Sequence, residues 1–429
     1  MCHQWRHNLC HSRTMAEGHI KNKEQLTMNN TWQIKTLQEL GTFSKGAGIS
    51  KADILPEGLP CIRYAEIYTK YDFQAKTLES FISRETADQS KHITKGTLLF
   101  AGSGETAEEI GKSIAYTGNE TAYAGGDTII FNFTNPQENT LFYSYYLNTT
   151  GRRQINKLGE GQSIVHIYPA ELAKVKVPVP PLSEQHRIVA VLETWDKAIS
   201  LTKRLIEQKE LQKRHLMQQL LTGKTRLKGF SGKWEKHILS DFTYRITRRN
   251  TENNKNVVTI SAKFGFIPQT TFFSKNIASS SIENYFLVYK NEFCYNKSYS
   301  QGYPSGTIKR LKDFEKAVVT PLYICFAIKD NNQLNYNFFE QYCETGLFNR
   351  HLDKIANEGG RAHGLLNVSV NDFFKLPLNV PSIKEQQAIA EILSAADRDI
   401  SLLKEKLAKL QQQKKGLMQI LLTGKVRLN

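Results

Sequence analysis

Three short strings in this 429-residue sequence resemble parts of sites that bind a nucleotide or modify a base. Gly111-Lys112-Ser113 has the ending of a phosphate-binding P-loop, but Thr106 stands where that loop requires its upstream glycine. Asn135-Pro136-Gln137 lacks the second proline and the aromatic residue of the loop with which adenine methyltransferases hold a base. Gly102-Ser103-Gly104 is a single Gly-x-Gly, which is too common to indicate a cofactor site. The sequence therefore predicts no catalytic residues.

Histidine and cysteine are present, but not at the spacings of a metal site. Cys2-His3 and Cys10-His11 match no standard zinc arrangement, and no other ligand surrounds His363 at a metal-site spacing. We therefore expect no bound metal and no cofactor held by this chain. Residues 1–30 are polar and without periodicity, which predicts a disordered leader, and Met28 is one alternative start.

The six cysteines are scattered without Cys-x-x-Cys spacing, which is typical of a reducing compartment. No segment approaches the ~18 apolar residues of a membrane span, and the N-terminus lacks the apolar core of a signal peptide. These features predict a soluble protein of the cytoplasm.

The charge balance indicates an acidic partner. Lys and Arg outnumber Asp and Glu by 57 to 41, which gives a net charge of +16 and a pI near 9.4. Nucleic acid is the first partner to consider, although basic ribosome-associated and membrane-surface proteins share this balance. Long donors beside glycine-rich or aromatic loops suit phosphates and base edges, and the alternative for each is a solvated surface charge. The candidates for DNA contact are Lys112, Arg152, Arg153, Gln162, Ser163, Lys297, Tyr303, Lys309, Arg361 and His363.

An internal repeat organises the elements that must position these residues. The segment from Pro180 to Leu227 returns from Pro381 to Leu428 at a constant offset of 201, with nearly half of the positions identical. A weaker correspondence precedes each copy, where residues 142–149 resemble residues 338–345. The sequence therefore predicts the order domain, helix, domain, helix, with two scaffolds that carry different loops.

Each repeated segment has the spacing of a coiled-coil helix. Prolines precede each copy, Gly223 ends the first, and about 40 intervening residues would extend roughly 60 Å. Lysines at some seam positions weaken a self-contained dimer, so we expect the two helices to pair with each other, antiparallel. The predicted seam positions, in steps of three and four, are Ile188, Leu192, Trp195, Ile199, Thr202, Ile206, Lys209, Lys213, Leu216 and Leu220, and then Ile389, Leu393, Ala396, Ile400, Leu403, Leu407, Leu410, Lys414, Leu417 and Leu421.

Short identical boxes at the ends of the two helical segments suggest a surface for a shared partner. The alternative is helix capping, because Glu and Gln favour first turns and Gly ends helices. The residues concerned are Glu184, Gln185, Thr222, Gly223, Lys224, Glu385, Gln386, Thr423, Gly424 and Lys425.

The predicted fold class is α+β, with two mixed α/β domains separated by two long helices that form an antiparallel coiled coil with a pseudo-twofold repeat. Strand-like runs at 97–100, 128–131 and 318–328 lie between Gly, Asn and Asp clusters. The predicted divisions are a leader at 1–30, domains at 31–180 and 229–380, and spacer helices at 181–228 and 381–429.

The chain resembles the specificity subunit of type I restriction-modification enzymes over nearly everything from Trp32 onward. The resemblance rests on the Pro-x-x-Glu-Gln entry into each helix, the Leu-Leu-Thr-Gly-Lys-x-Arg-Leu exit, and the run at Gly159–Ser163. It also rests on the segments 295–299 and 302–306 in the second half. The second half departs from the pattern at 359–364, where a Gly-Gly-Arg-Ala-His-Gly run replaces the glutamine-containing one.

The resemblance implies a non-catalytic DNA-reading subunit. Each domain would read one half of a bipartite, asymmetric site on double-stranded DNA. Two modification (methyltransferase) subunits would bind the helical region, and restriction (translocase and nuclease) subunits would join them. The resemblance also implies that S-adenosylmethionine, ATP and Mg belong to those partners. Two other hypotheses remain, namely an adaptor that binds an acidic partner without base preference and an enzyme with an unfamiliar active site.

Overall fold

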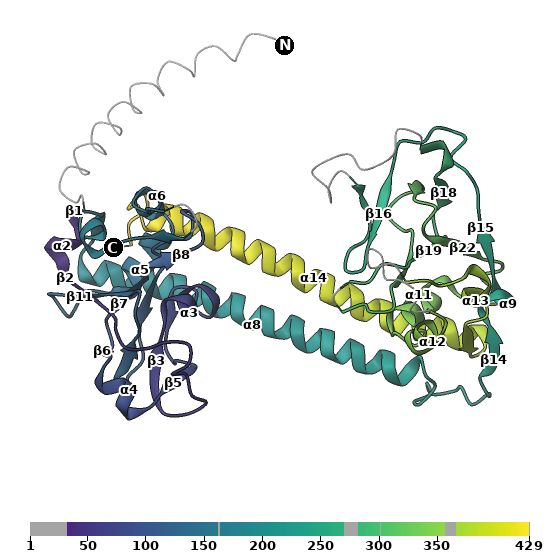
Figure 1. Cartoon of the computed structure of the whole chain (residues 1–429), viewed down its shortest axis with the longest axis horizontal. Coiled ribbons are helices and arrows are strands. Elements are labelled where there is room, and N and C mark those ends of the chain that lie inside the picture. Colours follow the sequence, from purple (N-terminus) through teal and green to yellow (C-terminus); the bar gives the residue numbers. More distant parts are fainter. Residues whose placement is uncertain (1–31, 162–163, 270–281, 301, 357–365, 429) are drawn as a thin grey trace, which may run out of the picture. The chain divides into compact units, whose positions relative to one another are not determined.

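The computed structural model describes residues 32–161, 164–269, 282–300, 302–356 and 366–428, so the leader predicted at 1–30 lies outside the described residues. The chain forms two compact units. The first contains the residues up to 201 together with those from 408 onward, and the second contains residues 202–407. Each unit consists of a mixed α/β domain and one half of each of two long helices (Figure 1).

A five-stranded sheet in the order β2-β11-β7-β9-β4 forms the centre of the first unit. Its middle strands are buried on both faces. Leu98 and Phe100 join the core that reaches the long helices, whereas Leu99 and Ala101 join a second core that contains Ile67 of helix α3. This alternation follows from the two-residue period of a strand. The strands are β2 (Gly41–Lys45), β4 (Gln74–Ala75), β7 (Leu98–Ala101), β9 (Ser113–Tyr116) and β11 (Thr128–Phe133).

Smaller sheets and short helices complete the first domain. A four-stranded sheet has the order β5-β3-β10-β6, and two-stranded pairs join β1 with β13 and β8 with β12. The strands are β1 (Gln33–Thr36), β3 (Leu59–Ile62), β5 (Ser80–Ile82), β6 (Lys91–Ile93), β8 (Ser103–Gly104), β10 (Ala122–Ala124), β12 (Val165–His166) and β13 (Lys176–Val179). The helices are α2 (Leu37–Leu40), α3 (Tyr64–Thr69), α4 (Arg84–Asp88), α5 (Thr140–Asn148), α6 (Arg152–Asn156) and α7 (Pro169–Leu172).

The second domain has a four-stranded sheet in the order β15-β22-β19-β20, with pairs β14-β23, β16-β17 and β18-β21. The strands are β14 (Glu235–Ile238), β15 (Thr243–Ile246), β16 (Val258–Ser261), β17 (Gly265–Pro268), β18 (Phe286–Tyr289), β19 (Phe293–Asn296), β20 (Thr307–Arg310), β21 (Lys316–Val319), β22 (Ile324–Ile328) and β23 (Pro377–Val380). The helices are α9 (Leu239–Phe242), the 3-10 turn η1 (Ile282–Asn284), α11 (Tyr336–Glu344), α12 (Asn349–Ile355) and α13 (Val370–Phe374).

The repeat seen in the sequence extends into the domains. The pair β1-β13 and its following helix α2 return as β14-β23 and α9, each with antiparallel register. Helix α5 corresponds to α11, and each begins at an asparagine cap, Asn139 or Asn335, whose side chain accepts a backbone N–H. The weak match of residues 142–149 with 338–345 therefore marks an equivalent helix in each domain.

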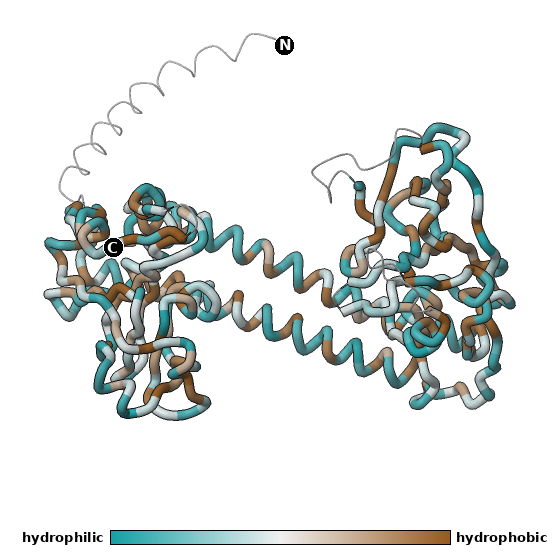
Figure 2. Tube along the Cα trace, in the orientation of Figure 1, coloured by the Kyte–Doolittle hydropathy of each residue, from teal (hydrophilic) through white to brown (hydrophobic). Residues whose placement is uncertain are grey.

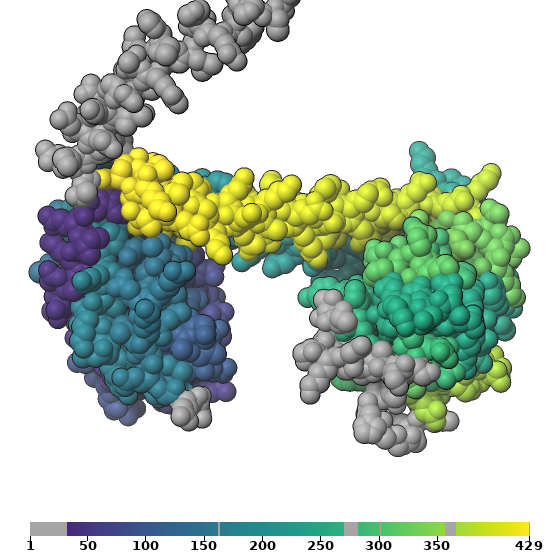
Figure 3. All heavy atoms as spheres, turned by 90° about the horizontal axis from the view of Figure 1, so that it is seen from above, coloured from purple at the N-terminus to yellow at the C-terminus, as the bar shows by residue number. Residues whose placement is uncertain are grey.

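The two long helices are α8 (Leu182–Leu220) and α14 (Ile383–Leu421), each of 39 residues. Every predicted seam position is buried or half-buried, which confirms the heptad interpretation. Within each unit the two helices run antiparallel, because the start of α8 packs with the end of α14 in the first unit and the reverse holds in the second. Figure 2 shows apolar residues recurring along both helices, and Figure 3 shows the end of α14 in yellow against the first domain.

Gly223 and Gly424 end the long helices with positive φ angles of 69° and 68°. A Cβ atom at either position would lie 3.3 Å from a tryptophan ring, Trp234 or Trp32, so glycine suits both the backbone and the packing. Among the described helices, none has an apolar stretch of the length that crossing a bilayer requires.

Candidate nucleic-acid interface

Two of the predicted DNA-contacting cations in the first domain are engaged within the fold. The Lys112 ammonium donates to the carbonyl oxygens of Tyr68 and Tyr71, at 3.4 and 2.5 Å, and its burial lowers its pKa. The Arg152 guanidinium donates through Nε and Nη2 to the Glu108 carbonyl at 3.0 and 2.7 Å, and burial lowers its pKa as well. Both side chains therefore brace loops, which differs from the predicted role on DNA.

The neighbouring Arg153 has a different environment. It lies on α6 one residue further along and is exposed. Its side chain is thus placed where a phosphate could reach it. Arg152, the adjacent arginine, directs its guanidinium toward the Glu108 carbonyl of the protein itself. The sequence alone could not show which of the two arginines faces solvent.

The glycine-rich run before α8 is shaped by a glycine that no other residue can replace easily. Gly161 has a φ of 124°, and a Cβ atom there would lie 2.0 Å from the Ile164 carbonyl oxygen. Paired backbone bonds between Glu160 and His166, of 2.9 and 2.8 Å, close the loop. The predicted contacts Gln162 and Ser163 fall inside this loop and lie outside the described residues.

A polar cluster beside this loop was not predicted. The Ser103 hydroxyl lies 2.9 Å from Nδ1 of His166, because β8 and β12 pair these residues directly. Asp127, at a φ of 58°, forms an ion pair with Lys45 at 3.1 Å. Burial raises the pKa of Asp127, but hydrogen bonds from Lys45 and Ser103 outweigh it and lower the pKa. Since the carboxylate contacts the serine, the cluster lacks the Ser-His-Asp order of a hydrolytic triad.

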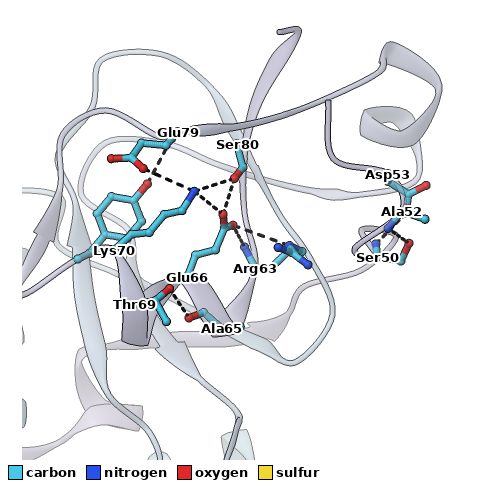
Figure 4. Close-up of polar contacts among 11 residues, drawn as sticks. Ser50, Ala52, Asp53, Arg63, Ala65, Glu66, Thr69, Lys70, Glu79 and Ser80 are labelled. Atoms are coloured by element: carbon cyan, nitrogen blue, oxygen red, sulfur yellow. Dashed lines mark hydrogen bonds and ion pairs between the residues drawn. The ribbon is translucent and has the colours of Figure 1, made fainter. Parts of the chain in front are cut away.

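A second buried cluster centres on Glu66 of α3 (Figure 4). Its carboxylate accepts hydrogen bonds from the Ser80 hydroxyl and from the Arg63 backbone N–H, and it lies 3.0 Å from the Lys70 ammonium. Burial raises the pKa of Glu66, yet these contacts lower it overall. Ser80 belongs to β5, so the cluster fastens α3 to that strand.

In the second domain, Lys309 is also engaged internally. Its ammonium lies 2.5 Å from Glu344 and 5.7 Å from the centre of the half-buried Tyr303 ring. Tyr303 and Glu344 line a pocket of about 160 Å³ together with Gly346 and Asn349. Lys309 and Tyr303 are therefore neighbours in the fold. The lysine is paired with Glu344, and the tyrosine ring is partly exposed.

The loop after β19 offers more accessible groups. Lys297 is half-buried and its carbonyl accepts the Leu366 N–H at 3.0 Å, while Tyr299 is exposed. The Asn296 side chain donates to the carbonyl of Ile260 at 3.3 Å, which ties this loop to the β16-β17 hairpin. Phe264, in the turn of that hairpin, is exposed beside Lys263, whose ammonium lies 5.4 Å from the ring centre.

Lys263, Phe264 and Tyr299 are exposed and were not among the residues predicted from the sequence to contact DNA. Lys263 beside Phe264 in a turn was the sequence feature that could have indicated this surface. The hydrogen bond by which Asn296 joins the loop after β19 to the β16-β17 hairpin is visible only in the fold. The predicted contacts Arg361 and His363 lie outside the described residues.

The repeated Glu-Gln boxes are buried within the chain. In the first unit the Glu184 carboxylate accepts bonds from Arg427 at 2.7 and 2.6 Å, from the Trp32 indole at 3.0 Å and from the Leu428 N–H at 3.1 Å. In the second unit Glu385 accepts bonds from Arg226 at 2.7 and 2.6 Å. Each box thus binds the arginine of the other copy's exit box.

The glutamines attach the helices to the domains. The Gln185 side chain accepts the Asn139 N–H at 2.9 Å and donates to the Pro180 carbonyl at 3.0 Å, and Gln386 repeats both contacts with Asn335 and Pro381 at the same distances. All four Glu and Gln side chains are buried and bonded inside the chain, and their contact with a partner stays a prediction.

The exit boxes are partly exposed. The Thr222 and Thr423 hydroxyls donate to the carbonyls of Gln218 and Gln419, at 2.6 and 2.7 Å. Lys224 and Lys425 are exposed, and contact of these four residues with a partner stays a prediction. Over the described ranges, no group of three His, Cys, Asp or Glu side chains is arranged to hold a metal ion.

Comparisons with known proteins agree with this architecture. A family model described as the type I restriction modification DNA specificity domain matches residues 29–211 and again residues 236–412. The chain is 24% identical over 434 residues to a putative type I restriction enzyme MjaX specificity subunit of Methanocaldococcus jannaschii, with 96% of this chain and 97% of that protein covered. A putative type I restriction enzyme specificity subunit of Haemophilus influenzae is 30% identical over 125 residues, which is 28% of this chain and 30% of that protein.

Solved structures share the fold. The S subunit of a type I restriction-modification system from M. genitalium aligns with a TM-score of 0.56 at 16% identity, over 92% of this chain and 97% of that one. A chain from a structure titled for complex assembly and conformational transition of the type I R-M system aligns with a TM-score of 0.53 at 14% identity, over 92% and 98%.

Proposed function

Because the chain belongs to the type I restriction-modification DNA specificity family, whose members recognise DNA sequence, we propose that it reads a bipartite, asymmetric site, with one half read by each unit. The observation that carries the proposal is the duplicated anchoring. Glu184 with Arg427 and Glu385 with Arg226 hold equivalent scaffolds, while the loops on the two scaffolds differ. Equal scaffolds with unequal loops suit two half-sites of unequal sequence.

The DNA contacts would come from exposed side chains near glycine-rich or hairpin loops. The exposed Arg153 in the first domain and Lys263 in the second, with the half-buried Lys297, offer cations to phosphates. Phe264 and Tyr299 offer apolar rings to sugars and base edges. Gln162, Ser163, Arg361 and His363 remain proposed DNA contacts, since amide, hydroxyl, guanidinium and imidazole groups can bond to base edges or to phosphates.

The long helices would set the spacing between half-sites. A 39-residue helix extends about 58 Å at 1.5 Å per residue. Dimeric readers bind half-sites about 34 Å apart, one helical turn of DNA, so a helical spacer converts its length into a gap between the bases that are read. A change in helix length would change the gap and leave the bases unchanged.

The helices would also bind two modification subunits. Leu201 and Leu402 occupy equivalent positions in the two copies, and both are unusually exposed, at 48% and 63%. Exposed apolar side chains at repeated positions fit two copies of one partner. The modification subunits would supply S-adenosylmethionine chemistry, and restriction subunits would supply ATP- and Mg-dependent steps. This chain would hold none of these cofactors and perform no catalytic step.

The test is to co-express the full chain with the modification subunit encoded beside it, in a host without the mark, and to map N6-methyladenine across the genome. Methylation at one split, asymmetric motif that needs both proteins supports the proposal. A soluble, DNA-binding complex that adds no mark contradicts it and favours an adaptor. Methylation or cleavage by the chain alone would favour an enzyme.

A further inference from the structure

A lysine at a seam position of α14 lies in a buried ionic joint in the first unit. Lys414 is only 5% exposed and forms an ion pair with Asp196 of α8. Its ammonium also lies 4.2 Å from the centre of the Phe73 ring and 4.9 Å from that of Tyr145. The Tyr145 hydroxyl donates to the other Asp196 oxygen at 2.5 Å. The joint thus connects α8, α14 and helix α5 of the domain.

The second unit has the same joint at equivalent positions. Lys213 of α8 lies 2.6 Å from Asp397 of α14, and the Gln341 side chain of α11 donates to Asp397 at 2.7 Å. Both lysines and both aspartates are related by the offset of 201 that relates the two copies. Helix α11 corresponds to α5, so each joint connects the same three elements.

We propose that these joints are positioning devices, in which the seam lysine, the aspartate and the domain's own hydrogen-bond donor fix each reading domain at one register and angle on the helix pair of its unit. The inference rests on the proposed function, since it concerns how accurately the half-sites are placed. An apolar seam tolerates a shift of one heptad, because one leucine can replace another. A buried charged residue does not tolerate such a shift, because the shift would separate it from its oppositely charged partner.

The two joints differ in exposure, which predicts different responses to salt. Lys414 is enclosed by two rings, so salt screens its ion pair weakly. In the second unit Asp397 is 45% exposed, and its ion pair with Lys213 is open to screening. The second domain is therefore expected to lose its fixed angle first as ionic strength rises.

Two further ion pairs between the helices provide controls. Lys404 lies 2.6 Å from Glu210, and Lys209 lies 3.7 Å from Asp399, and these four side chains are between 38% and 60% exposed. Among the described residues, no side chain of a domain helix bonds to either pair. Removing one of them tests the effect of an ordinary surface ion pair, which contributes little.

The experiment uses the complex of the full chain with its modification subunit and a DNA library in which the two half-sites are separated by different numbers of base pairs. We expect Lys414→Met and Lys213→Met to keep the same bases in both half-sites but to reduce the preference for one gap length by about tenfold. Lys213→Arg should restore the preference, and Glu210→Gln should retain it. Higher salt should weaken the gap preference of Lys414→Met more than that of Lys213→Met, because only the former still depends on the exposed joint.

Two results would overturn the inference. One is that both methionine variants, with wild-type helicity by circular dichroism, keep the gap preference. The other is that methylation falls equally at every gap length, which indicates a merely structural role. If the wild-type complex methylates no split motif, the proposed function fails instead. The two failures are therefore distinguishable.

Discussion

Replacement of Glu184 by glutamine tests the ion pair with Arg427, which joins the start of α8 to the C-terminal end of the chain in the first unit. The carboxylate is buried and accepts four hydrogen bonds, of which two come from the Arg427 guanidinium. Breaking a buried ion pair costs about 3–5 kcal/mol when the remaining charge has no other partner. Arg427 is 22% exposed and can be partly hydrated, and glutamine keeps an acceptor, so we expect a loss of about 2 kcal/mol. For a unit of this size that corresponds to a fall of roughly 4–8 °C in Tm.

The assay is thermal unfolding followed by circular dichroism, with tryptophan fluorescence as a second probe because the Trp32 indole binds the same carboxylate. Glu207→Gln, at an exposed position of α8, is the control and should shift Tm by less than about 1 °C. If Glu184→Gln has the same Tm as Glu207→Gln, the buried pair of Glu184 and Arg427 does not stabilise the unit, and the argument is refuted.

The same contact predicts a pH dependence. Burial raises the pKa of Glu184, but bonds from Arg427, Trp32 and Leu428 outweigh it and lower the pKa below its ordinary value near 4.5. A lowered pKa in the folded state contributes stability above the unfolded value, and that stability is lost as the pH falls through the folded pKa. The difference in Tm between wild type and Glu184→Gln should therefore be present at pH 7 and shrink below about pH 4. A difference that grows in acid would contradict this sign.

Three further changes follow from the site. Gly161→Ala places a Cβ atom against the Ile164 carbonyl, so methylation should fall at least about tenfold while Tm falls little, as a methylation assay and a melting curve would show. Arg153→Ala should lower DNA affinity and reduce the slope of log K against log salt by about 1, whereas Arg152→Ala should chiefly lower Tm; an unchanged slope for the former would exclude a phosphate contact. Leu402→Glu should weaken binding of the modification subunit by about 2 kcal/mol in calorimetry, and equal weakening by the neighbouring control Ser401→Glu would show that the leucine is not the contact.

The repeat and the helical seam could be predicted because both depend on spacing alone. A leucine or isoleucine every three or four residues needs a second apolar surface, whatever surrounds it. The lysines at seam positions favoured pairing of the two helices within the chain, which the structure confirms, but the sequence did not reveal the acidic partners of these lysines. Asp196 follows the seam residue Trp195, and only the fold shows that Asp196 turns toward Lys414 and Tyr145.

The candidate interface was harder to predict, because a basic side chain in a loop can face DNA or its own protein. Arg152 and Arg153 are adjacent and identical, yet the first donates to the Glu108 carbonyl and the second is exposed. The Glu-Gln boxes illustrate the reverse case. Their repetition suggested either a shared partner or helix capping, and the structure shows that Glu184 and Glu385 bind Arg427 and Arg226 of the same chain.

The claim that each unit reads its own half-site is tested most directly by changing the loops of one unit and mapping the methylated motif. The variant carries Lys297→Ala with Tyr299→Ala, and the control is Lys290→Ala, at an exposed ion pair with Glu315 in the same domain. The account predicts that base preference is relaxed in one half of the motif, while the other half and the gap stay as in the wild type. Simultaneous change in both halves, or an unaltered motif at full methylation, would contradict it.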